Sequence, residues 1–493
     1  MGHMSSVPCV PARDAVEKIA RFVLHAGYTE AEMKKHGFAK VPWQRPAIRS
    51  LLKYKIVDNS TLNLLVRLFW FGEVASADEI SSTLPPEIVD GLLRCRLADR
   101  EGDVFVPNCM LVHFGDLLLA CDSVRKAQTA VSDLVLGVNT PTKLLANSLI
   151  NVPDATVLDL GTGCGTLAMI ASHSARSVVA TDINPRALAF TAFNAALNGI
   201  TKVQTYVGDR FEPVGDQRFD VIVCNPPFFI TPKPRLLYTE NPHELDSFVE
   251  SLARTAPQFL KYGGFFQMLC EWVEFQGDSW RHRLMRWFED SGCDALILKA
   301  YEKSPADYTL TRAGESASLH GEASEDMIVE HIEYFAQQRV RKIVGGLLTL
   351  RRRTGKNWFL CEDMDELPDE SIGELLLERF ATQDIMSSYA DSELLALKPR
   401  LCSGVQLVQE STQENQSWKP KRVFLERRTG LVRRLAFDRG VADFVVRFDG
   451  THTLNRLVVE LAKQNKLPPE QAVDNGLRLV RKLSSVGLIT ITP

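Results

Sequence analysis

The chain has 493 residues, of which 45% are hydrophobic and 24% charged, and its formal net charge is −4. This length exceeds one ordinary core and predicts roughly two to four domains. No apolar run approaches the ~18 residues that a membrane span needs, and the net charge excludes an overall field that would attract nucleic acid. The opening Met-Gly-His-Met resembles a tag remnant, and no signal-peptide pattern follows it. We therefore expect a multidomain cytoplasmic protein.

The ten cysteines are scattered along the chain without a Cys-x-x-Cys pair, and most lie in apolar company. This pattern favours reduced, packed thiols over a zinc site or a disulfide framework. We expect no metal.

The first segment with a recognisable order of elements is 61–106. Its sequence predicts three helices and then a hairpin that turns at Glu101-Gly102-Asp103. Because this is the element order of a winged helix, we predict an N-terminal helical, winged-helix-like domain over residues 1–125.

Strand and helix patterns alternate in the central part of the chain. "ATVLDLGTGCGTLAMIASHSA" from residue 155 is a β-branched run, a glycine turn and an apolar helix, and "SVVATDINPRALAFTAFNAALNG" from residue 177 repeats the pattern. Shorter strands follow in "KVQTYVGDRF", "FDVIVCNPPFF", "GGFFQMLCEW" and "CDALILKAY". This alternation predicts an α/β domain with a doubly wound parallel sheet, in which ligands bind at the carboxyl ends of the strands.

The ends of the first three strands carry residues suited to a nucleoside ligand. A glycine turn, Asp159-Leu160-Gly161-Thr162-Gly163-Cys164-Gly165, follows the first strand, and such a turn lets a ligand approach the backbone. Asp182 and Asp209 end the next two, where they could bond ribose hydroxyls and an adenine amino group, although either could be a helix cap. Thr166 stands where a dinucleotide fingerprint needs glycine, which disfavours an NAD-dependent oxidoreductase.

The fourth strand stops abruptly in "VIVCNPPFFIT", residues 221–231. Proline lacks a backbone donor and forces the preceding residue toward extended geometry, so the strand must end at Asn225. A rigid loop is predicted after it.

With "DLGTGCG", "TDINPRAL", "GD" and "NPPF" in this order, the chain resembles the class I S-adenosylmethionine-dependent methyltransferases over about residues 126–360. The resemblance implies a seven-stranded Rossmann-like domain, which we place at 126–365. The Asn-Pro-Pro-aromatic motif is similar to that of enzymes that methylate glutamine amides, adenine N6 or guanine N2. The implied catalytic residues are Asn225, Pro226, Pro227 and Phe228. The implied cofactor-binding residues are Asp159, Gly161, Thr162, Gly163, Gly165, Asp182, Ile183, Asp209, Arg210, Asn225 and Thr140, with Thr142 a further candidate.

The chemistry explains why the strand would break at Asn225. The lone pair of an amide or exocyclic amine is delocalised, so the nitrogen is a poor nucleophile. If the Asn225 side-chain oxygen and the Pro226 carbonyl each accept one N–H, they orient the nitrogen and stabilise its developing charge. Phe228 would stack on the planar group. Phe229 departs from relatives that have Tyr after the prolines or His after Phe.

The methyl acceptor is left open by the sequence. Protein glutamine and a nucleobase of RNA or DNA are nearly equal alternatives, because mild acidity favours protein and the basic runs 339–356 and 419–434 favour phosphate. A peptide or small metabolite is the next alternative, and a non-catalytic cofactor-binding regulator is another. Arg235, Tyr238 and Asp246 are candidates for the substrate mouth, or else solvated helix residues.

The end of the chain repeats the pattern of its beginning. From residue 450 a helix, a turn, a helix opened by Leu-Pro-Pro-Glu and a closing strand are predicted, so we expect a C-terminal domain at 366–493 with a winged-helix-like end. The polar stretch 406–420 is predicted as a loop or linker. "GGLLTLRRRTGKNWF" from residue 345 is expected to form the sheet's final hairpin with "ALILKAY".

Overall fold

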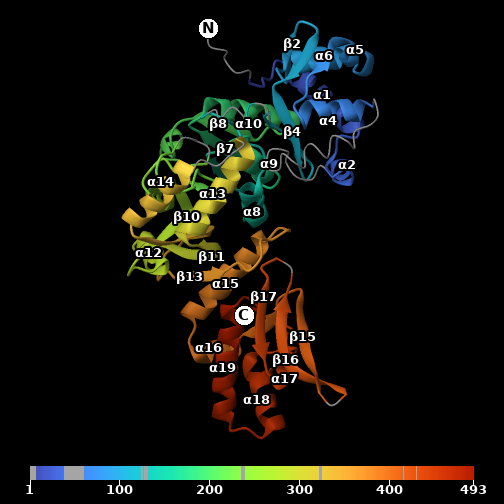
Figure 1. The fold of residues 1–493 in the computed structure, drawn as a ribbon. Coiled ribbons are helices and arrows are strands. Elements are labelled where there is room, and N and C mark those ends of the chain that lie inside the picture. The colour runs from blue at the N-terminus through green and yellow to red at the C-terminus, as the bar shows by residue number, and fades with distance from the viewer. Residues whose placement is uncertain are drawn as a thin grey trace. The chain divides into compact units, whose positions relative to one another are not determined.

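The computed structural model describes residues 7–37, 60–123, 126, 132–234, 239–320, 325–414, 416–428 and 430–492. Within these ranges, no helix has both the length and the apolar character that a membrane crossing requires. The chain divides into two compact units (Figure 1), and the finer division into three domains stays a prediction. The first unit comprises Met1–Ala146, Asn151–Ala295 and Tyr301–Phe359, and the second comprises Asn147–Ile150, Leu296–Ala300 and Leu360–Pro493.

An eight-stranded sheet forms the centre of the fold, in the order β13-β11-β12-β10-β9-β6-β7-β8. The strands from β10 to β8 pair in parallel, and β12 is antiparallel to β10. The strand order reverses between β6 and β9, which makes their carboxyl ends the topological switch point where ligands bind in such sheets. The bounds are β6 (Thr156–Leu160), β7 (Ser177–Asp182), β8 (Val203–Val207), β9 (Phe219–Cys224), β10 (Leu260–Phe275), β11 (Cys293–Lys303), β12 (Val340–Arg352) and β13 (Phe359–Asp363).

The sequence explains these strands and the helices that cover them. Strands β6 and β9 are almost wholly buried, as is typical of parallel strands with both faces covered. Helices α9 and α10 pack on β7, and α13 and α14 pack on β12. The helical bounds are α8 (Thr140–Ser148), α9 (Thr166–Ser172), α10 (Pro185–Leu197), η2 (Glu212–Val214), α11 (Ser247–Thr255), η3 (Ala256–Phe259), α12 (Trp280–Phe288), α13 (Pro305–His320) and α14 (Glu325–Gln337).

The predicted doubly wound, Rossmann-like sheet is confirmed, with two differences in detail. The sheet has eight strands rather than seven, because β13 adds to its edge next to β11. Strands β11 and β12 are neighbours as expected, but helices α13 and α14 lie between them in the chain. The prediction of a hairpin there was therefore wrong.

The N-terminal elements follow the predicted order of helices and hairpin. Gly102 has φ 62° in the turn between β2 and β3, and the winged-helix assignment stays a prediction. The β4–β5 hairpin is attached to α10 by the side-chain amides of Asn194 and Asn198, which pair with the backbone of Ala120 and Leu118. The bounds are α1 (Arg13–His25), α2 (Glu30–Lys35), α4 (Thr61–Phe69), β1 (Ala75–Ser76), α5 (Ala77–Thr83), α6 (Pro86–Arg94), β2 (Ala98–Glu101), β3 (Val104–Pro107), β4 (Cys109–Phe114) and β5 (Leu117–Asp122).

In the second unit, an apolar core forms among helices α16 to α19 and strands β14 and β18. The polar stretch 406–420 is not a linker, because it forms most of the long antiparallel hairpin of β15 and β16. The bounds are α15 (Gly373–Ser388), α16 (Asp391–Ala396), β14 (Lys398–Leu401), β15 (Val405–Glu414), β16 (Ser417–Arg427), β17 (Arg433–Phe437), α17 (Arg439–Val445), α18 (Leu454–Asn465), α19 (Pro469–Ser485) and β18 (Ile489–Thr492).

Candidate active site

The strand register brings the predicted site residues to one edge of the sheet. Cys224 pairs with Leu160, Leu160 with Thr181, and Asp182 with Val207. Because all four strands are parallel, the residues that end or follow them are neighbours along this edge. The edge therefore carries, in spatial order, Asn225, the glycine turn, Asp182 and Gly208.

The glycines of the turn have two different roles. Gly161 and Gly163 have φ of 74° and 57°, and a Cβ added to either would meet no atom within 4 Å. These two glycines leave open space beside the backbone, as close approach of a ligand requires. A Cβ on Gly165 would meet Thr191 at 2.9 Å, so that glycine allows the close packing of α9 on α10.

Asp159 and Thr162 support the turn from inside the fold. The Thr162 hydroxyl and the Ala168 N–H both donate to Oδ2 of the buried Asp159, at 2.6 and 3.0 Å. Burial raises the pKa of the Asp159 carboxyl to about 7, against these two hydrogen bonds, which lower it. In the structure both residues fix the shape of the glycine turn, and their predicted contact with a cofactor stays a prediction.

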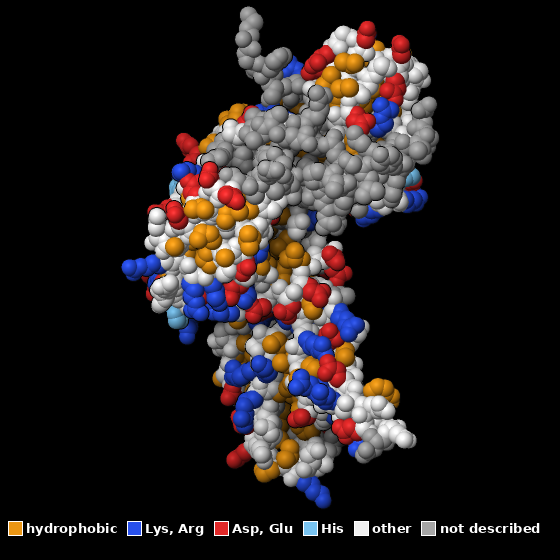
Figure 2. Space-filling view, viewed as in Figure 1, with side chains coloured by type: hydrophobic (Ala, Val, Ile, Leu, Met, Phe, Trp, Pro, Cys, Tyr) orange, Lys and Arg blue, Asp and Glu red, His pale blue; other side chains and the backbone are white. Residues whose placement is uncertain are grey.

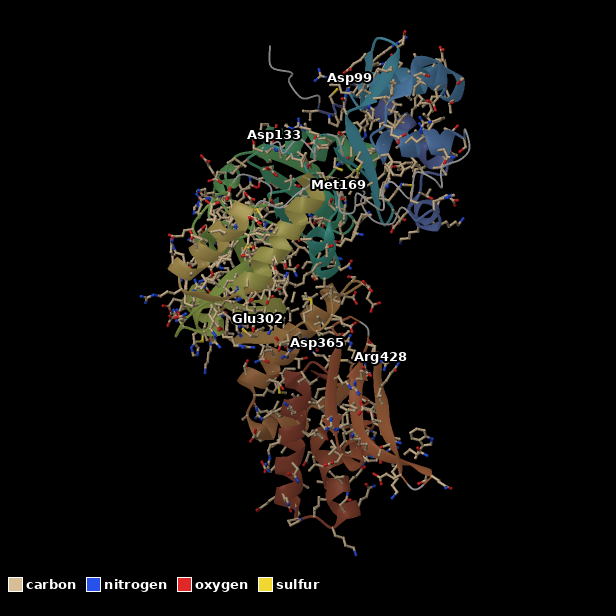
Figure 3. The ribbon with its side chains drawn as sticks, in the orientation of Figure 1. Asp99, Asp133, Met169, Glu302, Asp365 and Arg428 are labelled. Carbon is tan, nitrogen blue, oxygen red and sulfur yellow. The ribbon has the colours of Figure 1, made fainter. Side chains whose placement is uncertain are left out.

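Asp182 is held by the backbone on both sides. Its Oδ2 accepts the Gly163 N–H and its Oδ1 accepts the Asn184 N–H, each at 2.9 Å. Burial raises the pKa of this carboxyl, and the backbone hydrogen bonds oppose the shift. The Asn184 amide donates to the carbonyl of Asp133, a residue labelled in Figure 3. Each carboxylate oxygen keeps a further lone pair, so the rigid Asp182 can still accept two hydroxyl donors.

Next to Asp182, two apolar side chains lie in solvent. Ile183 and Val207 are 61% and 60% exposed at the carboxyl ends of neighbouring strands. A flat aromatic ligand resting on them would cover this apolar surface. Beyond them, Asp209 forms an exposed ion pair with Arg210 at 3.0 Å.

Asn225 is oriented by a chain of polar contacts. The Thr142 hydroxyl donates to Asn139 Oδ1 at 2.8 Å, so its oxygen is free to accept from Asn225 Nδ2, which lies 3.5 Å away. Among the residues that the structure describes, Asn225 Oδ1 is buried and has no hydrogen-bond partner. The site thus contains a fixed acceptor without a donor. Thr142 makes this contact, whereas Thr140 is exposed.

The loop after Asn225 is fixed by backbone pairing. Phe229 donates its N–H to Thr239 O and accepts the Asn241 N–H, at 2.9 and 2.8 Å. Pro226 and Phe228 are buried, and the Phe228 ring meets the Phe229 ring edge-on at 4.9 Å. These contacts hold Phe229 beside Thr239 and Asn241.

A buried polar network behind the loop was not found from the sequence. The hydroxyls of Tyr301 and Tyr308 donate to the carboxylate of Glu271, which is wholly buried in β10. The Tyr308 hydroxyl also accepts the Ile230 N–H at 2.9 Å. Burial raises the pKa of Glu271, and the charge of Arg312 is the largest influence that lowers it.

Arg312 connects this network to the aromatic residues. Its guanidinium lies 3.6 Å from the centre of the Phe229 ring and 5.4 Å from that of Tyr308. One face of Phe229 is thereby covered by a cation–π contact.

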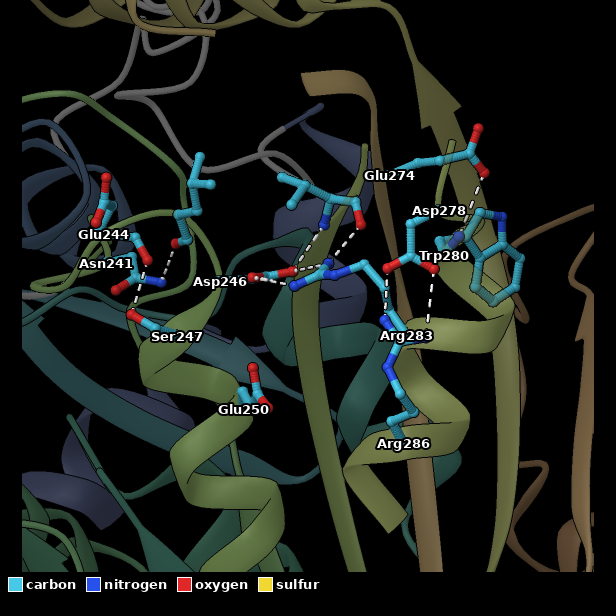
Figure 4. Close-up of polar contacts among 12 residues, drawn as sticks. Asn241, Glu244, Asp246, Ser247, Glu250, Glu274, Asp278, Trp280, Arg283 and Arg286 are labelled. Atoms are coloured by element: carbon cyan, nitrogen blue, oxygen red, sulfur yellow. Dashed lines mark hydrogen bonds and ion pairs between the residues drawn. The ribbon is translucent and has the colours of Figure 1, made fainter. Parts of the chain in front are cut away.

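Of the three residues predicted for the substrate mouth, the structure describes Asp246. Arg235 and Tyr238 lie outside the described residues. Asp246 is buried in a two-pronged ion pair with Arg283, at 2.7 and 3.0 Å, and also accepts the Val273 N–H (Figure 4). Asp246 is therefore neither solvated nor available to a substrate, and it holds α12 to β10.

The two basic runs are partly paired with acids. Figure 2 shows Lys and Arg interspersed with Asp and Glu over the visible face of the second unit. Such pairing engages some of the cations of each run, and contact with nucleic acid stays a prediction. The pairs within the runs are Arg351 and Arg353 with the buried Asp294, Lys342 with Glu302, Arg341 with Glu274, Lys419 with Glu414, Arg428 with Glu426, Arg433 with Glu362, and Arg434 with Glu410.

Comparison with known proteins identifies the domain. Residues 136–272 match the family model described as "Methyltransferase small domain". This segment is a class I S-adenosylmethionine-dependent methyltransferase domain. The resemblance inferred from the motifs is thus confirmed.

Three relatives of this domain carry names that specify a substrate. Release factor glutamine methyltransferases of Cereibacter sphaeroides and Geobacter sulfurreducens are 36% and 34% identical, over 28% and 23% of this chain and 53% and 44% of their own length. The ribosomal protein uL3 glutamine methyltransferase of Bradyrhizobium diazoefficiens is 36% identical over 26% of this chain and 44% of its own. The chain thus spans about half the length of the curated relatives it matches.

The residues at the methyltransferase domain's sheet edge fit S-adenosylmethionine. Open space beside Gly161 and Gly163, the remaining acceptor capacity of Asp182 and the exposed Ile183 are of the kind that its amino acid chain, ribose and adenine require, and their contact with it stays a prediction. Asn225 Oδ1 still lacks a hydrogen-bond donor, and a second molecule could supply it.

Proposed function

We propose that this protein transfers a methyl group from S-adenosylmethionine to the side-chain amide nitrogen of a protein glutamine. The observation that carries the proposal is the buried Asn225 Oδ1, an acceptor without a partner among the described residues, at the switch point of a methyltransferase sheet. A primary amide supplies the N–H donors that this oxygen lacks.

In this mechanism the chain's residues orient the nucleophile. S-adenosylmethionine supplies an electrophilic methyl group when bound. Asn225 Oδ1 and the Pro226 carbonyl accept the two N–H groups of the substrate amide, which holds the nitrogen lone pair toward the methyl and stabilises the charge that develops on it. Because Thr142 and the two prolines fix these acceptors in advance, little reorganisation is needed at the moment of reaction.

Two observations favour glutamine over a nucleobase. The named relatives are glutamine methyltransferases. Part of the basic runs that would bind phosphates is engaged in ion pairs, some of them with buried acids such as Asp294 and Glu362.

The test is transfer of tritiated methyl from S-adenosylmethionine to a purified bacterial release factor and to ribosomal protein uL3, with peptide mapping of the product. We expect label on glutamine. In single turnover, Asn225→Ala should reduce transfer about a hundredfold to a thousandfold, or about 2.7–4 kcal/mol, as removal of one preorganised partner does. Its affinity for S-adenosylmethionine, measured by calorimetry, should be unchanged, because in this mechanism Asn225 contacts the substrate amide and not the cofactor.

Two outcomes would contradict the proposal. If a whole lysate carried label in nuclease-sensitive material and none on protein, the substrate would be a nucleic acid. Undiminished transfer by Asn225→Ala would remove this asparagine from the mechanism.

A further inference from the structure

The second unit contains a pocket that is separate from the candidate active site. None of the active-site residues described above lines it. Three arginines from different elements line it: Arg379 of α15, Arg427 at the end of β16, and Arg433 of β17. All three side chains are buried, and the relative exposure of Arg427 is only 5%. Apolar side chains of Leu375, Leu431 and Ile489 complete much of the wall.

The acids around this pocket balance only part of its charge. Glu362 pairs with Arg379 at 2.6 Å and with Arg433 at 2.8 Å, so one carboxylate serves two guanidinium groups. The other carboxylate that lines the pocket, Glu378, is exposed to solvent. The pocket therefore has three buried cations and one buried anion, which pairs with two of them.

Two nitrogens in the pocket lack acceptors. Arg427 Nε and Arg379 Nη1 are buried without a hydrogen-bond partner in the described chain, and the side chain of Arg427 forms no ion pair with any described residue. An arginine cannot relieve this cost by losing a proton, as a buried lysine can. A buried, unpaired cation is strongly destabilising, so its presence points to an anion that binds there.

We propose that this pocket binds a phosphate group, as inorganic phosphate or as the phosphomonoester of a small molecule. The excess of two buried positive charges matches the −1.5 to −2 charge of a phosphomonoester at neutral pH better than that of one carboxylate. Guanidinium groups bind phosphate oxygens in a fixed two-pronged geometry, and the hydroxyls of Thr382 and Thr490 add possible donors at the wall.

Calorimetric titration of the full chain tests this proposal, with inorganic phosphate as the probe and ionic strength held constant with chloride. One site per chain is expected, and acetate should bind at least tenfold more weakly. Titration with glycerol phosphate distinguishes the two sources: tighter binding indicates a phosphomonoester, and weaker binding indicates free phosphate.

Arg427→Met is the decisive variant. It should weaken phosphate binding at least tenfold, because it removes a charge-assisted contact. In phosphate-free buffer it should melt no lower than the wild type, because it also removes an unpaired buried cation, and this shows that lost binding is not lost folding. Arg422→Met, on the exposed part of the same strand, is the matched control and should bind as the wild type does. The proposal is overturned if phosphate does not bind, if acetate binds as tightly, or if the two variants behave alike.

Discussion

Tyr308→Phe is the substitution that tests whether the network behind the Asn-Pro-Pro loop positions it. The Tyr308 hydroxyl donates to Glu271 at 2.6 Å and accepts the Ile230 N–H at 2.9 Å, five residues beyond Asn225. Phenylalanine fills the same space without either bond. The change therefore removes two hydrogen bonds and little packing.

The size of the effect follows from what these two partners lose. The Ile230 N–H becomes a buried donor without an acceptor, which costs about 1–3 kcal/mol. The Glu271 carboxylate loses one of its two tyrosine donors, and bonds to charged groups contribute about 1.5–3 kcal/mol. Because the two losses share one hydroxyl, we expect about 2–4 kcal/mol less stability and a shifted loop. A displacement near 1 Å at the acceptor would slow methyl transfer about a hundredfold.

The assay compares Tyr308→Phe with Tyr334→Phe. The Tyr334 hydroxyl also accepts one backbone N–H, but that of Leu245, which lies outside the loop. A positioning role requires that Tyr308→Phe lower kcat while leaving KM for S-adenosylmethionine near the wild-type value, and that Tyr334→Phe leave both unchanged. If the two variants lose stability and activity in parallel, Tyr308 serves stability alone and the reasoning is refuted.

Three further outcomes are expected. Asp182→Ala should weaken calorimetric binding of S-adenosylmethionine at least tenfold, and unaltered affinity would exclude Asp182 from the ribose site. The Asp159 carboxyl has a pKa of about 7 in the folded protein and about 3.9 in the unfolded chain. Between these pH values the folded state binds more protons than the unfolded state. The free energy of unfolding should therefore fall as pH rises from about 4 to about 7. Calorimetric scans should find this fall reduced, by at most about 4 kcal/mol, in Asp159→Asn, and an equal fall in both proteins would contradict the assignment. Arg283→Met should cost about 3–5 kcal/mol in urea denaturation by stranding the buried Asp246, and Asp246→Asn on that background should recover part of the loss.

The parts of the site that the sequence predicted are those encoded within a few residues. The glycine turn, the acid that ends β7 and the prolines after β9 each impose a backbone geometry locally. The parallel register then brings them together, since Leu160 pairs with both Cys224 and Thr181. A strand-helix alternation was therefore sufficient to predict this edge of the sheet.

The parts that the sequence did not predict depend on distant or unusual environments. Glu271 lies 37 residues from Tyr308, and Tyr308 lies 78 residues from Ile230, so no local pattern connects them. The β15–β16 hairpin was mistaken for a linker because most of its residues are exposed, which removes the apolar alternation that identifies a strand. Its backbone pairing is the same as in any antiparallel hairpin, but this pairing cannot be predicted from amino-acid composition.

The buried groups without partners are the most informative features of both units. An unpaired buried acceptor or cation costs stability, and such groups are rare in folded proteins unless something compensates for them. Asn225 Oδ1 is held in place by Thr142 and rigid prolines, so its cost is borne in the free protein and is recovered when a donor arrives. The same reasoning applies to Arg427, whose charge cannot be removed by deprotonation. In each case the missing partner defines the ligand chemically: an N–H donor for Asn225 and an oxyanion for Arg427.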